Sequence, residues 1–306
     1  MSTPEKTTSE KISGLSICIP VYNNAAQLDR LLTAIQRQNT PGLEVVAVNN
    51  ASTDDSLKIL EAWQGRLNLK IFTTPRTISL PDNWLLALSL GTREFLKLQL
   101  AEDMIPDGAV NALLAAIQQD ERLGFVFGNT EPIDAQGALI RSGPPAKYWA
   151  RVNAMRRQMP AARLLKDKAR CLAQAGIRLN PMGDANAIIF RASLLPHLRH
   201  GVNKLASAFQ TWPEYEIFLR LFAAAEAGYL DIPASHYFHD EEKSIVHTRS
   251  LRLRRRAYDI GSAHILVLLM MDPDLKPLTS ELGKFYFLKH ILLQLGRVGR
   301  VAFKKE

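Results

Sequence analysis

Two adjacent carboxylates, Glu102 and Asp103, end an apolar run at 95–100 that has the composition of a β-strand. In an α/β sheet, residues at the carboxyl end of a strand lie at the edge where ligand crevices form. Neighbouring carboxylate oxygens at that edge suit a hard divalent cation, which commonly shares its ligands with a substrate diphosphate. A solvated acidic turn explains this stretch equally well when it is taken alone, so the surrounding elements must decide.

A second acidic pair, Glu214 and Glu216, follows Pro213. Proline suits the first turn of a helix, and the pattern predicts a helix that runs to about Ala227 and is ended by Gly228. Both carboxylates would then lie in the opening turn, where the helix dipole stabilises an anion. Their side chains point in different directions, so only one of them needs to face a site.

Strand-like and helix-like segments alternate along the first half of the chain. Apolar runs of strand length occupy 15–20, 43–48, 67–72, 95–100 and 124–128, and helical patterns occupy 28–35, 55–63, 83–93 and 109–119. Asp82 and Asp107 are placed to cap the last two of these helices. A strand, a helix and a strand in succession form a unit with parallel strands. The sequence therefore predicts an α/β fold, with a mostly parallel sheet flanked by helices.

The later part of the chain continues this pattern with more loops. Residues 130–145 contain several Gly and Pro residues, which predict a hairpin or loop. Residues 147–175 are basic and helical in pattern, and fit either an insertion on the side of a site where a second substrate would bind or a helix that only packs on the core. A loop and strand at 180–190, a helix at 192–198 and a strand at 229–232 complete the predicted core.

Composition bounds the class of protein. The 306 residues are 47% hydrophobic with a net charge of +8, which supports a sizeable core and suits nucleic acid, an anionic membrane or phosphorylated substrates. The polar residues 1–13 predict a disordered start. Cys18 and Cys171 are far apart and predict buried reduced thiols. Because neither a signal core nor an apolar run of membrane-spanning length is present, we expect a cytoplasmic protein.

Residues 248–306 predict a basic, amphipathic helical extension. Arginines cluster at 249–256, and the last helix carries Phe285, Leu288, Ile291, Leu292 and Leu295 on one face. Such a helix suits an anionic surface, so 249–306 is a candidate peripheral contact on the inner face of the membrane. An apolar stripe is more often packed against its own protein. Because no recognisable reader module surrounds the arginines, we expect no nucleic-acid partner.

Four motifs together resemble glycosyltransferase family 2, the inverting nucleotide-sugar enzymes with the GT-A fold. They are Leu15–Asn24 with its Pro-Val-Tyr-Asn turn, Asn49–Asp54, the set formed by Asn83-Trp84, Glu94–Lys97 and Glu102–Pro106, and Glu214–Arg220. The resemblance covers about residues 15–247. It implies a GT-A (Rossmann-like) domain over 14–247, followed by the C-terminal helical extension.

The resemblance also implies roles for particular residues. The nucleotide would contact Pro20, Tyr22, Asn49, Ala101 and Glu102, with Glu102 nearer the ribose. Asp103 would hold a divalent metal, manganese or magnesium, on the diphosphate, where a cation stabilises the charge of the leaving group. Glu214 would be the general base for the acceptor hydroxyl. His239 and His247 are placed where a late histidine could approach the metal, although a lone histidine is more often structural.

Three positions depart from the family pattern. Asn49 replaces an aspartate, and its amide can both donate and accept, which leaves the base preference open. The family's three-acid pattern is reduced to the sequence Leu-Ala-Glu-Asp at 100–103, and the expected catalytic aspartate is Glu214. These departures allow a catalytically degenerate relative that acts as a nucleotide-binding or interaction protein.

With the resemblance, the sequence predicts a metal-dependent, inverting glycosyltransferase of cell-surface polysaccharide or glycolipid synthesis. Its expected partners are a nucleotide-sugar donor and a glycan or lipid-linked acceptor. The degenerate relative is the alternative, and a nucleotidyltransferase is disfavoured because no Gly-rich phosphate loop follows the first strand. Metal-dependent hydrolysis of the donor would separate the first two, since a binding module would show affinity without turnover.

Overall fold

The computed structural model describes residues 12–157, 184–198 and 213–239, together with Lys276. Cys171, His247 and the extension predicted at 248–306, with its proposed membrane contact, lie outside these ranges apart from Lys276. Within them, no helix combines the length and the apolar content needed to cross a membrane.

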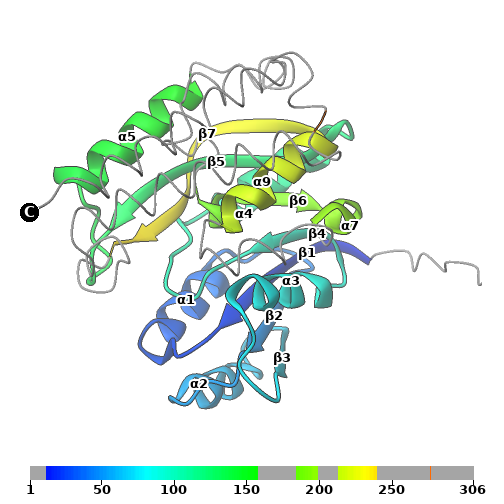
Figure 1. Ribbon diagram of the computed structural model, residues 1–306, viewed down its shortest axis with the longest axis vertical. Coiled ribbons are helices and arrows are strands. Elements are labelled where there is room, and N and C mark those ends of the chain that lie inside the picture. The colour runs from blue at the N-terminus through cyan, green and yellow to red at the C-terminus, as the bar shows by residue number, and fades with distance from the viewer. Residues whose placement is uncertain (1–11, 158–183, 199–212, 240–275, 277–306) are drawn as a thin grey trace, which may run out of the picture.

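A seven-stranded, mostly parallel sheet runs through the described part of the chain, in the order β3-β2-β1-β4-β6-β5-β7 (Figure 1). Its strands are β1 (Ile12–Val21), β2 (Glu44–Asn49), β3 (Leu69–Thr73), β4 (Arg93–Leu98), β5 (Leu123–Ile133), β6 (Ile188–Arg191) and β7 (Glu226–Phe238). Only β6 runs antiparallel to its two neighbours, β4 and β5. This arrangement confirms the predicted α/β class.

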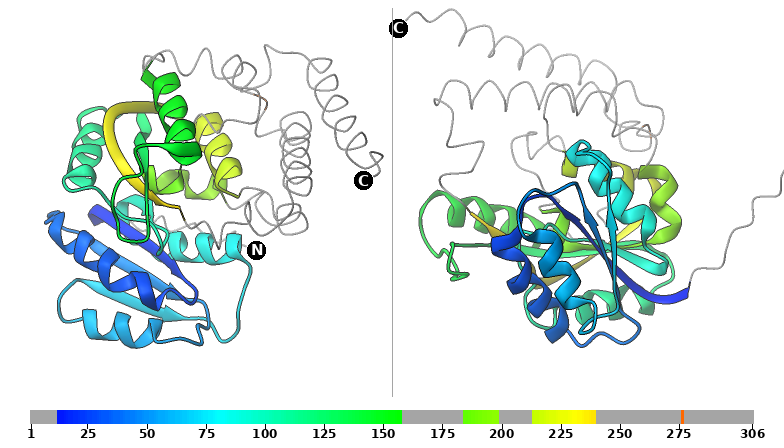
Figure 2. Two further views of the ribbon diagram at one scale, coloured as in Figure 1. Left: turned by 90° about the vertical axis from the view of Figure 1, so that its left-hand side faces the viewer. Right: turned by 90° about the horizontal axis from the view of Figure 1, so that it is seen from below.

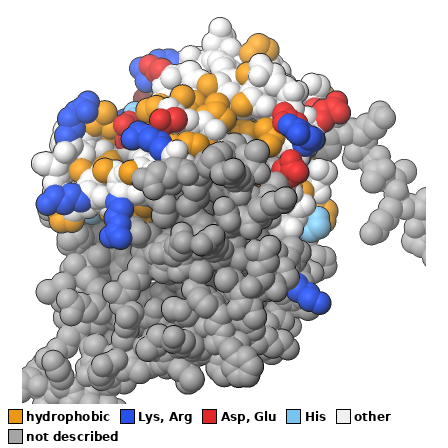
Figure 3. Space-filling model, turned by 90° about the horizontal axis from the view of Figure 1, so that it is seen from above, with side chains coloured by type: hydrophobic (Ala, Val, Ile, Leu, Met, Phe, Trp, Pro, Cys, Tyr) orange, Lys and Arg blue, Asp and Glu red, His pale blue; other side chains and the backbone are white. Residues whose placement is uncertain are grey.

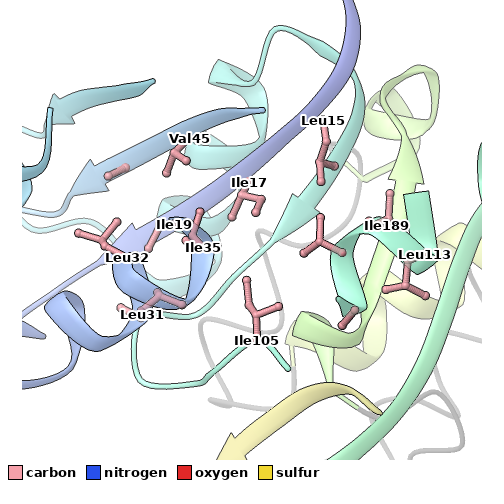
Figure 4. Close-up of a cluster of buried hydrophobic side chains, with 14 of the residues drawn as sticks. Leu15, Ile17, Ile19, Leu31, Leu32, Ile35, Val45, Ile105, Leu113 and Ile189 are labelled. Carbon is pink, nitrogen blue, oxygen red and sulfur yellow. The ribbon is translucent and has the colours of Figure 1, made fainter. Parts of the chain in front are cut away.

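Helices cover both faces of the sheet (Figure 2). The cluster of buried apolar side chains on one face includes residues of α1 (Ala25–Arg37), α2 (Ser56–Trp63) and α4 (Ala109–Gln119), and the cluster on the other includes residues of α3 (Leu80–Leu90), α7 (Leu195–Leu198) and α9 (Pro213–Ala224). Successive strand residues face opposite sides, so Ile17 and Ile19 join the first cluster (Figure 4) and Cys18 joins the second. Each such side chain contributes about 1.5–3 kcal/mol when it is fully buried.

One further helix and two 3-10 turns complete the described chain. Helix α5 (Gly143–Arg157) packs on β5, where Arg156 Nη1 donates to the carbonyl oxygen of Gly128 at 2.7 Å. The 3-10 turns η2 (Ala185–Ala187) and η3 (Ala192–Leu194) flank β6. Seen from above (Figure 3), the described surface carries basic, acidic and hydrophobic side chains interspersed with one another.

The starts of two helices differ from the prediction. Ser79, and not Asp82, caps α3, because Ser79 Oγ accepts from the backbone N–H of Asp82 at 3.3 Å and donates to Asp82 Oδ2 at 2.6 Å. Helix α4 is preceded by Gly108, whose φ of 76° is left-handed, so the predicted cap at Asp107 was wrong. Both aspartates lie near a helix start, but neighbouring residues make the cap.

The strands at the far edge are longer than predicted. β5 and β7 pair in parallel over most of their length, with three irregularities of register, and the 130–145 region turns back at an isolated antiparallel bridge between Ile133 and Leu139. Helix α9 ends at Ala224, so Gly228 lies inside β7 and does not end the helix. A Cβ on Gly228 would meet side-chain atoms of Leu123 and Val126 at 3.0 Å, so this glycine marks a close approach between strands.

A buried carboxylate connects residues of β1, β2 and β3 with the residue that precedes β4. Glu44 begins β2 and is fully buried, and it accepts hydrogen bonds from Ser16 Oγ at 2.6 Å, Lys70 Nζ at 2.6 Å, and the N–H and Oγ1 of Thr92 at 2.8 Å each. Burial acts to raise the pKa of Glu44, but these hydrogen bonds outweigh it and lower the pKa to about 2. Glu44 is therefore ionised in the folded protein at neutral pH.

Candidate functional site

The carboxyl ends of β1 and β4 lie side by side in the middle of the sheet. The chain leaves β1 through α1 toward β2 on one side, whereas β4 lies on the other side, which makes this position a topological switch point. Ligand crevices of open α/β sheets form at such points. The structure thus brings Pro20, near the end of β1, and Tyr22, just after it, to the same edge as Ala101, Glu102 and Asp103, which follow β4.

The loop after β1 is bonded to the loop after β2. Asn23 bonds Thr53 and Ser52: its Oδ1 accepts from Thr53 N at 2.8 Å, and its N–H donates to Ser52 Oγ at 3.1 Å. The next two backbone N–H groups also donate across the loops, from Asn24 to Ser56 Oγ at 2.9 Å and from Ala25 to Asp54 Oδ2 at 3.0 Å. Asn23 and Ala51 have left-handed φ values of 54° and 50°, which lets each loop turn sharply. These bonds fix the turn that begins at Tyr22, whose side chain is 48% exposed.

Asn49, the last residue of β2, and Asn50, which follows it, stabilise different segments. Asn49 is buried, and its Oδ1 accepts from Ser52 N at 3.2 Å, so it shapes its own loop. Asn50 Nδ2 donates to the carbonyl oxygen of Ile78 at 3.0 Å, and Asn50 Oδ1 accepts from Ile78 N at 2.8 Å. Asn50 therefore holds the segment that leads into α3. Sequence reasoning gave Asn50 no role, although it lies within the second motif.

The Glu102–Asp103 loop is held against the end of β7. Asp103 is 1% exposed, and its Oδ1 accepts from the N–H of Phe238 at 2.6 Å while its Oδ2 accepts from Asn186 Nδ2 at 2.5 Å. Met104 and His236 exchange two backbone hydrogen bonds of 2.9 Å. The loop is thus an ordered part of the sheet edge and not a solvated turn.

Beneath the loop lies a buried polar network. Asn186 Nδ2 also donates to both carboxylate oxygens of Asp184, at 2.8 and 2.9 Å, and Ser235 Oγ donates to Asp184 Oδ2 at 2.5 Å. Lys97 Nζ, fully buried in β4, donates to the carbonyl oxygen of Asn186. Sequence reasoning quoted Lys97 and the 180–190 loop but gave the loop's polar side chains no role, because these contacts join distant parts of the chain.

The network places ionisable side chains in a buried environment. Burial raises the pKa of Asp103 well above its ordinary value, and the nearby charges of Asp184 and Glu102 raise it further. Burial also lowers the pKa of Lys97 to about 8, although the charges of Asp184 and Asp103 oppose that shift. Two carboxyl groups and one amine thus share a buried region, with Glu102 half-buried beside it.

The donor set suits a hard cation whose other ligands come from a substrate. In the described ranges, no three His, Cys, Asp or Glu side chains gather into a metal site. The two hydrogen bonds to Asp103 occupy about two of the roughly four lone-pair positions of its carboxylate. Because Glu102 and Asp184 add negative charge nearby, the loop fits a divalent cation that is also bound by phosphate oxygens.

Helix α9 begins at Pro213, as predicted, and carries Glu214 in its first turn. The side chain of Glu214 is outside what the structure describes. Glu216 is 2% exposed and pairs with Arg220, whose Nη2 and Nε lie 2.9 and 3.1 Å from Glu216 Oε1. This buried ion pair removes Glu216 from the candidates for a catalytic base. The backbone N–H of His239 donates to the carbonyl oxygen of Ile133 at 2.9 Å.

Sequence comparison identifies relatives of this chain. Residues 16–173 match the family model described as Glycosyl transferase family 2. The chain is 26% identical over 139 residues to the chondroitin synthase of Escherichia coli, a match that covers 45% of this chain and 20% of that protein. It is 33% identical over 85 residues to the abequosyltransferase RfbV of Salmonella typhimurium, which covers 26% of each. The matched stretch is thus a minor part of both relatives.

Solved structures share the fold. S. aureus TarS 1-349 in complex with UDP-GlcNAc has a TM-score of 0.56 at 16% identity, over 94% of this chain and 81% of that one. The mannosyltransferase PcManGT from Pyrobaculum calidifontis, in complex with GDP-Man and Mn2+, has a TM-score of 0.54 at 17% identity, over 97% of this chain and 77% of that one. At these identities the likeness establishes the architecture alone.

Proposed function

The chain belongs to glycosyl transferase family 2 and has the GT-A fold that its motifs predicted, and from this premise we propose that it is an inverting glycosyltransferase with a nucleoside-diphosphate sugar as donor. One observation carries the proposal. The ordered Glu102–Asp103 loop lies beside the end of β1 at the switch point of the sheet. The acidic residues follow β4 and the aromatic residue Tyr22 follows β1 at this edge, and both types serve nucleotide-sugar recognition.

The donor nucleotide binds along this edge, against Pro20, Tyr22, Asn49, Ala101 and Glu102. The exposed ring of Tyr22 offers an apolar face to the base or ribose. Glu102 accepts hydrogen bonds from ribose hydroxyls, since an ionised carboxylate is a strong acceptor. The complexes of TarS with UDP-GlcNAc and of PcManGT with GDP-Man support a nucleotide-sugar donor.

Asp103 holds a divalent cation, manganese or magnesium, on the donor diphosphate. When bound, such a cation stabilises the negative charge that develops on the departing nucleoside diphosphate. The chain's own part is to keep the Asp103 carboxylate in place through Phe238 and Asn186. The Mn2+ in the PcManGT complex supports the use of a divalent metal.

Glu214 is the general base at the start of α9. Its carboxylate takes the proton of the acceptor hydroxyl while that oxygen forms a bond to the anomeric carbon. The bond from the anomeric carbon to the phosphate oxygen breaks, and its electron pair leaves with the nucleoside diphosphate. A single displacement inverts the anomeric configuration. The amino end of the helix favours the ionised form that a base requires.

The acceptor is a glycan or a lipid-linked glycan of cell-surface polysaccharide synthesis. The matched relatives include a chondroitin synthase, an abequosyltransferase and a poly(ribitol-phosphate) β-N-acetylglucosaminyltransferase. These names agree on sugar transfer to a polymer or glycoconjugate and differ in the sugar, so they support the class of acceptor only.

Calorimetric binding of UDP and GDP, each with and without Mn2+, tests the donor site. Asp103→Asn should lose the metal-dependent part of binding, and Glu102→Gln should weaken binding with and without metal. Asp120→Asn, on a half-buried residue that pairs with the exposed Arg122, should bind as the wild type does. If neither nucleotide binds the wild type, the proposed UDP or GDP donor site is wrong. Binding without donor hydrolysis would favour the degenerate relative, which the replacement at Asn49 and the loss of an acid at Leu100 allow.

A further inference from the structure

Both ends of the Leu100–Asp103 loop meet one side chain, that of Asn186. Asn186 Oδ1 accepts from the backbone N–H of Leu100 at 2.5 Å, and Asn186 Nδ2 donates to Asp103 Oδ2 at 2.5 Å. Asn186 is fully buried in η2, just before β6. A single amide group therefore spans the loop from its first residue to its last.

The orientation of this amide is fixed by its surroundings. On the Nδ2 side lie oxygens of Asp103 and Asp184, each of which accepts a hydrogen bond from the amide. On the Oδ1 side lies the N–H of Leu100, which can only donate. Turning the amide over would oppose an oxygen to carboxylates and an NH2 group to an N–H, so one orientation is strongly preferred.

Asn186 is itself held at several points. Asp184 caps η2 and accepts from the backbone N–H of Asn186 at 3.2 Å as well as from its side chain. Ser235 of β7 donates to Asp184, and Lys97 of β4 donates to the carbonyl oxygen of Asn186. Strands β4 and β7 therefore both anchor the residue that anchors the loop.

We propose that Asn186 is a positioning residue for donor binding. It holds the two ends of the Leu100–Asp103 loop at a fixed separation and orients the Asp103 carboxylate. The inference rests on the proposed role of this loop in nucleotide-sugar binding. Only an amide offers a donor and an acceptor from one planar group. Aspartate at this position would keep the acceptor for Leu100 but would place a third carboxylate between Asp103 and Asp184, and alanine would remove both contacts.

The test compares Asn186→Ala and Asn186→Asp with Asn153→Ala. Asn153 is a matched control because it is buried and also bonds a backbone N–H and carbonyl oxygen, those of Thr130 in β5, and not Asn186 or the Leu100–Asp103 loop. Three readouts are taken on the full chain: thermal unfolding, amide hydrogen exchange at Leu100 and Phe238, and calorimetric binding of UDP and GDP with Mn2+. Exchange reports the loop directly and needs no ligand.

We expect faster exchange at Leu100 in Asn186→Ala and affinity for the bound nucleotide reduced about tenfold or more in both Asn186 variants, as for residues that orient a metal ligand. Asn153→Ala should lower the thermal stability by about as much as Asn186→Ala does, and should bind the nucleotide with the affinity of the wild type. Unchanged exchange at Leu100, or an equal loss of affinity in Asn153→Ala, would overturn the positioning role. If the wild type binds neither nucleotide, the proposed function fails, and exchange at Leu100 still decides whether Asn186 orders the loop.

Discussion

Thr53 N donates a hydrogen bond of 2.8 Å to Asn23 Oδ1, so that a residue with left-handed backbone geometry joins the loops after β1 and β2. Asn23→Ala removes this acceptor and leaves an alanine at φ 54°, and we expect it to lower the free energy of unfolding by about 1–3 kcal/mol. Asn23→Gly removes the same acceptor without the backbone strain and should lose less. Urea denaturation of both variants measures the difference, and equal losses would contradict the strain argument.

Ala51 provides the opposite case, since its φ of 50° strains an alanine that has no side-chain function. Ala51→Gly should relieve that strain and raise the free energy of unfolding by up to about 1 kcal/mol, after the greater freedom of glycine in the unfolded chain is subtracted. Ala112→Gly inside α4 is the control and should destabilise by about 1 kcal/mol. A loss of stability in Ala51→Gly would show that the loop tolerates alanine without strain.

Glu44 should make stability depend on acid pH. Its pKa is lowered from 4.5 to about 2 in the folded protein, so its stabilisation is complete above about pH 4.5 and disappears as the pH falls toward 2. Glu44→Gln should therefore lower the free energy of unfolding by roughly 1–3 kcal/mol at pH 7 and by less at pH 3. Denaturant titrations of the wild type and the variant at pH 7 and pH 3 measure the two losses. Glu61→Gln, on an exposed residue of α2, should leave the free energy of unfolding almost unchanged at both pH values.

The acids of α9 should separate in function. Glu214→Gln should reduce kcat about 10²- to 10⁴-fold and leave UDP or GDP affinity unchanged, since a general base acts on the acceptor. Glu216→Gln should instead destabilise the protein by about 3–5 kcal/mol, because Arg220 would remain buried without its carboxylate. Steady-state kinetics and thermal unfolding of the two variants distinguish these outcomes. Full activity in Glu214→Gln would remove that residue from the mechanism.

The sequence predicted what local patterns determine. The alternation of strands and helices gave the parallel half of the sheet, and the polar loops after β1, β2 and β4 lie at one edge because parallel strands end together. For the acidic pair at 214 and 216, the residues alone left the choice open and the family resemblance assigned the base to Glu214. The structure adds that Glu216 is paired with Arg220.

Contacts between residues far apart in the chain could not be predicted from the sequence. Asn186 and Asp103 are 83 residues apart in the chain, and neither residue type nor spacing indicates that their side chains meet. A strand within 180–190 was predicted, but its antiparallel place between β4 and β5 was not, since a strand of four residues does not indicate its neighbours. Ser79 and Gly108 were missed for a different reason: several residues near each helix start could cap it, and only the backbone path selects one.

The order of the strands has a consequence for synthesis of the protein on the ribosome. β1 to β4 emerge first and can pair with one another. Among the described residues, the strand that pairs with the other side of β4 is β6, which begins at Ile188. Until then the nascent chain presents the backbone hydrogen-bonding groups along one side of β4 to any other chain nearby. Translation pauses before Ile188 would prolong that exposure, so the yield of soluble protein should be most sensitive to elongation rate in this interval.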